Sequence, residues 1–173
     1  MKSDNKKIRL LALTGMLTAL TTVATIAIRI PTATKGYINL GDTMVNMSAW
    51  ITGGLYGGIA GGIGSLLADI ISGCYIYAPA TLVIKFFMAF CCYGVYKFCS
   101  GKFSPLTARI ISAVVSELIM ITGYDIFTGF MYNSVYSAMT ALPEFVVQGI
   151  AGGTFSVILY ECIIKRIPVL KKH

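Results

Sequence analysis

Long uncharged stretches, broken by proline, glycine and charged residues, dominate the pattern of hydrophobic and polar positions along the chain. Because about 20 apolar residues in a helix cross the hydrocarbon of a bilayer, these stretches predict six membrane helices. We place the helices at Ile8–Ile30, Thr43–Leu67, Ala80–Phe98, Leu106–Gly123, Asp125–Leu142 and from Pro143 to about Ile164. The fifth contains Gly129, Asn133 and Ser134, which leaves open a short, tilted or broken helix.

Composition supports an all-α integral membrane protein. The chain has 173 residues, of which 56% are apolar and 12% are charged, and its mean hydropathy is +0.77. A soluble domain carries roughly 25% charged residues. The composition therefore excludes an ordinary soluble enzyme and a disordered chain, and it predicts a single six-helix membrane domain over 1–173.

Basic residues gather at the two ends of the chain and predict its orientation. Lysines and arginines next to membrane helices stay on the cytoplasmic side, so both termini are expected there, with an even number of crossings. This topology places 31–42, 99–105 and the region near 142 outside. Lys97, Lys102 and Arg109, in the connection between the third and fourth helices, oppose that placement. We interpret the terminal basic clusters as membrane anchors, not as a nucleic-acid site.

Several kinds of chemistry lack their usual residues. The five cysteines show no metal-ligand spacing and the only histidine is His173, so we expect neither a metal site nor a cofactor. Gly101 and Lys102 lack the upstream glycine of a phosphate-binding loop, so ATP hydrolysis by this chain is not expected. These observations predict a protein that is not an enzyme.

Glycines are concentrated in the second predicted helix at a spacing of four residues. They form two series, 53–57–61 and 54–58–62. Small residues at this spacing let another helix approach closely. We interpret this glycine face as a packing or sliding surface, and we predict that Gly53, Gly57 and Gly61 contact a partner.

Acidic residues inside apolar helices are costly to insert and therefore point to function. Glu117 lies in the middle of the fourth predicted helix, and Asp125 and Glu144 lie near helix ends, where capping is an equally good explanation. Asp69 and Lys85 fall near the ends of adjacent helices. Mutual neutralisation is the simplest prediction for that pair.

Two strings of the sequence resemble a known family. The segment GYINLGD (36–42), followed by the glycine series and DIISGCYIYAPATLVIK (69–85), resembles the S component of energy-coupling factor (ECF) vitamin transporters, in the riboflavin, hydroxymethylpyrimidine or pyridoxine subgroup. The resemblance extends from the first helix to Pro143 and Gln148. It implies a six-helix, multi-pass protein of the bacterial plasma membrane, in contact with lipid. It also implies partners, namely a T subunit and two cytoplasmic ATPases.

The resemblance also implies site residues. The loop from Tyr37 to Asp42, with Asn39, is expected to cover the vitamin, and the side chains expected to line the pocket are Glu117, Tyr124 and Gln148. Glu144 occupies a position where related sequences often have an amide nearby, so its role stays open. Gly15 and Ala19 occupy the small positions of the first helix that are expected to contact the T subunit.

The substrate predicted from the residues is a small neutral or cationic heteroaromatic vitamin. Three acids and no clear pocket cation other than Lys85 disfavour an anionic one. Pyridoxine-like and hydroxymethylpyrimidine-like compounds are the first two candidate substrates, and riboflavin is the third. Two other functions stay open, a membrane enzyme with Glu117 and Asp125 as paired carboxylates and a self-sufficient secondary transporter.

Overall fold

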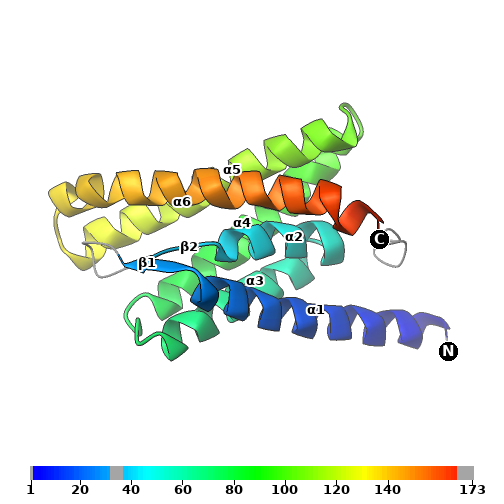
Figure 1. Cartoon of the computed structure of the whole chain (residues 1–173), viewed down its shortest axis with the longest axis horizontal. Helices are drawn as coiled ribbons and strands as arrows, with labels where there is room; N and C mark the ends of the chain where they lie inside the picture. The colour runs from blue at the N-terminus through cyan, green and yellow to red at the C-terminus, as the bar shows by residue number, and fades with distance from the viewer. Residues whose placement is uncertain (1, 32–36, 167–173) are drawn as a thin grey trace.

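The computed structural model describes residues 2–31 and 37–166 and is built almost entirely of helices (Figure 1). Within these described residues, five helices are long and apolar enough to cross a membrane, and α2 is a short sixth α-helix. The elements are α1 (Lys2–Ala27), β1 (Arg29–Pro31), β2 (Tyr37–Asn39), α2 (Gly41–Thr52), α3 (Gly54–Ile71), α4 (Ala78–Ser100), α5 (Pro105–Met131), α6 (Val135–Cys162) and the 3₁₀ helix η1 (Ile164–Arg166).

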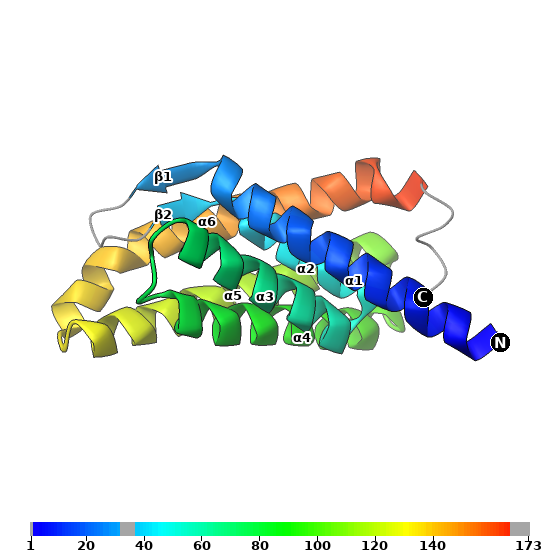
Figure 2. The same cartoon turned by 90° about the horizontal axis from the view of Figure 1, so that it is seen from below.

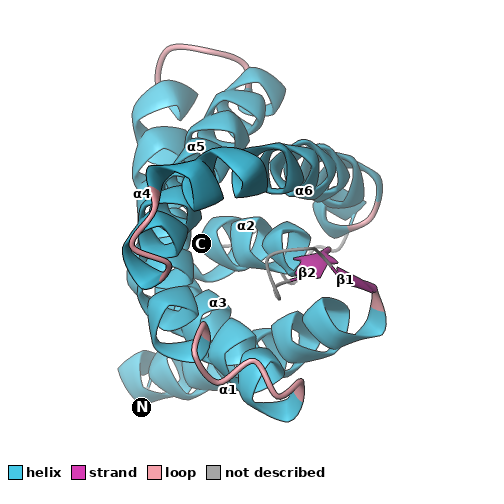
Figure 3. Ribbon diagram, turned by 90° about the vertical axis from the view of Figure 1, so that its left-hand side faces the viewer, coloured by secondary structure: helices cyan, strands magenta, loops and turns pink. Residues whose placement is uncertain are grey.

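The short helix α2 lies at the centre of the bundle, and the longer helices surround it (Figure 3). Its residues are almost all buried, including polar ones such as Asn46 and Ser48. The strands β1 and β2 pair antiparallel, with Arg29 opposite Asn39. This hairpin lies between α1 and α6 at one side of the bundle (Figure 3). The centre of the bundle is therefore a helix with both apolar and polar buried side chains.

The predicted second helix is two helices in the structure. The helix is interrupted at Gly53, whose φ is +90°. Helix α3 then runs back antiparallel to α2. A positive φ favours glycine because a side chain would collide with the backbone there. The prediction missed the break because the run from Thr43 to Leu67 contains neither proline nor charge, so its composition resembles one continuous helix.

Both glycine series pack inside the molecule. A Cβ at Gly57 would lie 2.7 Å from the Ala49 Cα of α2, and one at Gly58 would lie 2.8 Å from the Phe86 ring of α4. Gly61 faces Val45 of α2 in the same way. The predicted close approach of helices is therefore present, but α2 and α4 of the same chain cover these faces. This corrects the expectation that Gly57 and Gly61 are open to a partner.

The last two helices begin and end at other residues than predicted. Helix α5 continues through Gly123 and Asp125 to Met131, and α6 contains Pro143 in its interior. The turn between them is made at Tyr132–Ser134, where Asn133 has a φ of 47°. Asparagine tolerates this left-handed conformation better than most residues. The predicted boundaries at Gly123 and Pro143 were therefore wrong.

The start of α1 and the end of α6 lie at the same end of the bundle (Figures 1 and 2). The connection between α4 and α5 lies at that end too, whereas the β hairpin, the α3–α4 turn and the α5–α6 turn lie at the other. The predicted topology placed 99–105 at the end opposite the termini, and that placement is wrong. The break at Gly53 is the cause, because it adds one reversal of direction before α4.

Candidate functional site

A small polar cavity lies near the end of the bundle that carries the β hairpin. Its volume is about 40 Å³. Strand β2, helices α3 to α6 and the α3–α4 turn contribute to its wall. The lining residues are Asn39, Asp69, Cys74, Tyr77, Thr81, Tyr124, Phe145 and Gln148. Amides, hydroxyls and aromatic rings thus meet in one place, although they come from distant parts of the chain.

Gln148 lines this cavity and connects three elements of the fold. Its Nε2 donates to Asp42 Oδ2 at 2.7 Å. Its Oε1 accepts from the Asn39 backbone N at 3.2 Å and from Asn39 Nδ2 at 3.4 Å. Asn39 Oδ1 in turn accepts from Gly41 N at 2.8 Å. The hairpin, the start of α2 and helix α6 are therefore held together by side-chain amides that also face the cavity.

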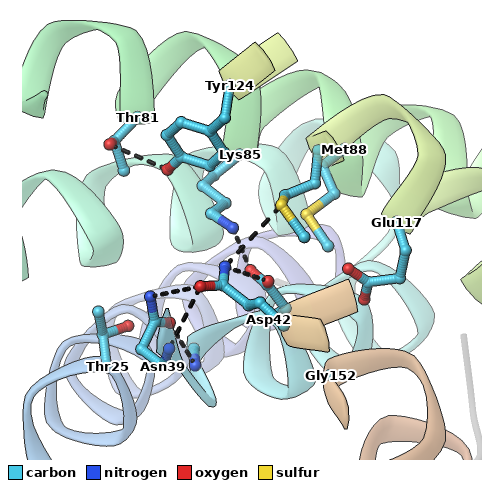
Figure 4. Close-up of polar contacts among 12 residues, drawn as sticks. Thr25, Asn39, Asp42, Thr81, Lys85, Met88, Glu117, Tyr124 and Gly152 are labelled. Carbon is cyan, nitrogen blue, oxygen red and sulfur yellow. Dashed lines mark hydrogen bonds and ion pairs between the residues drawn. The ribbon is translucent and has the colours of Figure 1, made fainter. Parts of the chain in front are cut away.

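Asp42 and Lys85 form a buried ion pair beside Gln148 (Figure 4). The lysine side chain is 2% exposed and the aspartate 0%. We expected Lys85 to neutralise Asp69, but it forms its ion pair with Asp42 of α2. Asp69 lies instead in the cavity wall. A buried charge needs a partner of opposite charge because desolvation is costly, and the start of α2 supplies it from inside the bundle.

Aromatic side chains form another wall of the cavity. The rings of Tyr124 and Phe145 stack at a centroid distance of 5.5 Å and an interplanar angle of 24°. The Tyr124 hydroxyl donates to Thr81 Oγ1 at 3.0 Å, and Lys85 Nζ lies 5.2 Å from the Tyr124 ring centre. These contacts fix the orientation of the flat ring surface.

Two groups of the α3–α4 turn have raised pKa values. Burial, and secondarily the Asp69 carboxylate, raises the pKa of the Cys74 thiol. Burial, and secondarily Tyr132, raises the pKa of the Tyr77 hydroxyl well above its ordinary value. Both groups are therefore protonated at neutral pH and give the cavity neutral hydrogen-bonding walls.

Glu117 lies on the other side of Asp42 from Tyr124 and Thr81 (Figure 4). Its Oε1 accepts from Asn46 Nδ2 at 2.9 Å, and the side chain lines a separate apolar groove between α5 and α6. Gly152 makes room for both acids, because a Cβ there would lie 2.6 Å from Asp42 Cβ and 3.2 Å from Glu117 Oε1.

The structure brings some of the predicted site residues together and separates others. Asn39, Tyr124 and Gln148 line the cavity, and Asp42 reaches it through Gln148. Glu117 lies outside the cavity wall, and half-buried Glu144 is not among the lining residues. The side chain of Tyr37 lies outside the described residues.

Residues of the α3–α4 region were missed as site residues. Asp69, Cys74, Tyr77 and Thr81 all belong to the string 69–85 that carried the resemblance. The string was the available signal, but only the turn shows that these positions face one cavity. Phe145 gave no signal, because an aromatic residue in an apolar helix is usual.

The cavity is suited to binding a small flat molecule. It combines a stacked aromatic pair with amide groups that both donate and accept hydrogen bonds. Among the described residues, no cluster of three histidine, cysteine or acidic side chains could hold a metal ion.

Three comparisons show which known proteins this chain is similar to. The family model of the ECF-type riboflavin transporter S component matches residues 5–166. A protein of Pyrococcus woesei described as "Uncharacterized protein in gap 3'region" is 34% identical over 156 residues, which cover 87% of this chain and 99% of that protein. The solved structure of the S component of a bacterial ECF transporter superposes with a TM-score of 0.69 at 20% identity, covering 96% of this chain and 99% of the other. That structure therefore shares the fold.

Proposed function

This chain belongs to the family of S components of ECF-type riboflavin transporters, and from that membership we propose that it binds one heteroaromatic vitamin in the cavity. The observation that carries the proposal is the stacked Tyr124–Phe145 pair facing the amides of Asn39 and Gln148. Stacking and paired amide hydrogen bonds suit a flat ring with polar substituents.

The charge of the buried ion pair supports a vitamin that is not an anion, a pyridoxine-like or hydroxymethylpyrimidine-like compound. Lys85 is neutralised by Asp42, so this lysine does not favour an anionic ligand. Riboflavin is the third candidate, and the matching family model, which describes a riboflavin transporter component, supports it. Either ligand requires the cavity to widen, and the hydrogen bonds between Asn39 and Gln148 are the contacts that would open.

Membership of the family also supports a proposal about partners. A T subunit and two cytoplasmic ATPases would supply the energy, because the sequence has no phosphate-binding loop of its own. Gly15 and Ala19 are exposed on α1, and nothing lies within 4 Å of a Cβ built at Gly15. This outer face of α1 is where we propose that the T subunit makes contact.

The distribution of basic residues supports a cytoplasmic location for both termini, in the plasma membrane. The end of α4 and the α4–α5 connection, which carry Lys97 and Lys102, lie at the end of the bundle where α1 starts and α6 ends, so these lysines no longer oppose the proposed orientation. Single cysteines at Lys102 and Asn133, in a chain without its five native cysteines, test this with an impermeant maleimide. Labelling of the Lys102 position from outside intact cells would contradict it.

Ligand titration of the purified protein tests the substrate proposal. Gln148→Met keeps the size of the side chain but removes its amide, and we expect pyridoxine or riboflavin, whichever binds, to bind about tenfold more weakly, a loss of roughly 1.4 kcal/mol. Thr140→Val changes an exposed position of the same helix and should leave the affinity unchanged. Equal affinity for the two variants would refute the cavity as the binding site.

A further inference from the structure

Two lysine–phenylalanine pairs lie where α4 ends and the chain turns into α5. Lys97 and Phe98 belong to the last turn of α4, and Lys102 and Phe103 belong to the connection that follows. All four residues are exposed, and the exposed fractions of Phe98 and Phe103 are 68% and 52%. Each pair therefore presents one cationic and one aromatic side chain on the surface of the bundle.

Neither of these two lysines forms an ion pair with another residue that the structure describes. Two other cations of this end of the bundle differ from them, because Arg109 and Lys165 both pair with Glu161. The sequence has no acidic residue over 70–116, so the end of α4 and the start of α5 supply no local counter-charge. The positive charge of the connection is therefore open to an anion from outside the chain.

The two pairs form one patch on the surface. Lys102 Nζ lies 4.4 Å from the centre of the Phe98 ring, so the lysine of the second pair contacts the phenylalanine of the first. We call Lys97, Phe98, Lys102 and Phe103 the connection patch. The patch joins α4 and α5, which are both long and apolar enough to span a membrane. It therefore lies at the membrane surface, where lipid headgroups meet the hydrocarbon.

We propose that the connection patch binds the headgroup phosphate of an anionic phospholipid. Lysine side chains at the membrane surface attract anionic headgroups, and aromatic rings beside them insert at the boundary with the acyl chains. A soluble phosphate would leave both rings in water. A zwitterionic lipid carries a positive group of its own, which opposes the lysines. A lipid with a net negative charge is the occupant that suits all four side chains.

The proposed site is more local than the general attraction of basic residues to a membrane. Lys6 and Lys7 are exposed near the start of α1, at the same end of the bundle. They carry the same charge as the two lysines of the connection patch but lie outside it. Their removal is therefore a matched test of charge alone. The inference does not depend on the identity of the vitamin or on the proposed transport function.

Fluorescence quenching by brominated lipids tests the proposal on the full-length protein in phosphatidylcholine vesicles. Phe103→Trp places a reporter in the connection patch, and wild-type protein, whose one tryptophan is the buried Trp50, supplies the background. Brominated phosphatidylglycerol should associate with the reporter about 5- to 30-fold more tightly than brominated phosphatidylcholine, because each lysine contributes to the attraction. Glycerol phosphate in large excess should not relieve the quenching.

Two double variants of the reporter protein separate the patch from charge in general. Lys97→Gln/Lys102→Gln should reduce the preference for phosphatidylglycerol to about twofold or less, whereas Lys6→Gln/Lys7→Gln should keep it. Equal quenching by the two lipids in the reporter protein, an equal loss of preference in both double variants, or relief by glycerol phosphate would each show that the proposal is wrong. The comparison of the two lipids needs no lysine variant, so it decides the matter even if a double variant fails to fold.

Discussion

Asp42 and Glu117 are two buried carboxylates on either side of Gly152, and their surroundings differ. Asp42 uses both oxygens inside the bundle, one for the Lys85 ion pair and one for Gln148. Glu117 uses one oxygen for Asn46, and its side chain borders the groove between α5 and α6.

The difference separates a carboxylate whose two oxygens both hold helices together from one that uses a single oxygen among the described residues. Asp42 connects α2 with α4 and α6, so its loss affects three helices at once. Glu117 has one hydrogen bond to α2, through Asn46. Burial alone therefore does not distinguish the two roles, whereas the use of each oxygen does.

Removing the charge of Asp42 should have the largest effect. Asp42→Asn leaves the Lys85 ammonium buried without its counter-charge, and we expect the free energy of unfolding to fall by about 3–5 kcal/mol. Denaturant unfolding in detergent measures this. The double variant Asp42→Asn/Lys85→Met removes both charges and should recover part of the loss. A single variant as stable as the wild type would show that the ion pair contributes nothing.

A methyl group between the two acids should have the next largest effect. Gly152→Ala places a Cβ 2.6 Å from Asp42 Cβ, and the resulting displacement should cost about 1–3 kcal/mol of unfolding free energy. Gly94→Ala is the matched control, because nothing lies within 4 Å of a Cβ there, and higher helix propensity should raise stability by up to about 1 kcal/mol. Equal stability changes in the two variants would mean that Asp42 and Glu117 are not held closely around Gly152.

Removal of the Tyr124 hydroxyl should lower the free energy of unfolding less than the two preceding changes. Tyr124→Phe keeps the ring that stacks on Phe145 but loses the hydrogen bond to Thr81, which should cost about 0.5–1.5 kcal/mol of stability. Tyr136→Phe, at a residue that is 76% exposed, serves as the control in the same unfolding assay. A larger loss for the control would contradict the assignment of the hydroxyl to the buried network.

The smallest effect is expected for Glu117→Gln. Glutamine keeps an acceptor for Asn46, so the unfolding free energy should change by less than about 1 kcal/mol. Because Glu117 lies outside the cavity wall, vitamin affinity should stay within about twofold, or roughly 0.4 kcal/mol, in the same titration as Gln148→Met. A tenfold loss of affinity would return Glu117 to the vitamin site, as the family resemblance implied.

The sequence predicted the class of fold well because hydropathy and length determine which helices can span a membrane. It failed at helix ends that depend on one backbone angle, namely Gly53 and Asn133. It also misplaced a boundary at Pro143, because proline favours the first turn of a helix but is also tolerated inside membrane helices. These errors changed which end of the bundle each loop occupies.

The site was harder to predict than the fold. Asn39, Tyr124 and Gln148 were expected together through the family resemblance, and the structure places them around one cavity. The Asp42–Lys85 pair was not expected, because its members are 43 residues apart and the reversal at Gly53 determines which helices face each other. Local charge patterns therefore suggested Asp69, the nearer acid, as the partner of Lys85.

The central position of α2 has a consequence for the biogenesis of the protein. Its 12 residues form a helix of roughly 18 Å, too short for a hydrocarbon layer of about 30 Å, and it carries Asp42 and Asn46 in its buried surface. Such a segment has no stable place in lipid before its neighbours are present. We therefore expect α2 to become enclosed only after α4 and α6 have been synthesised, because these helices bring Lys85 and Gln148 to Asp42.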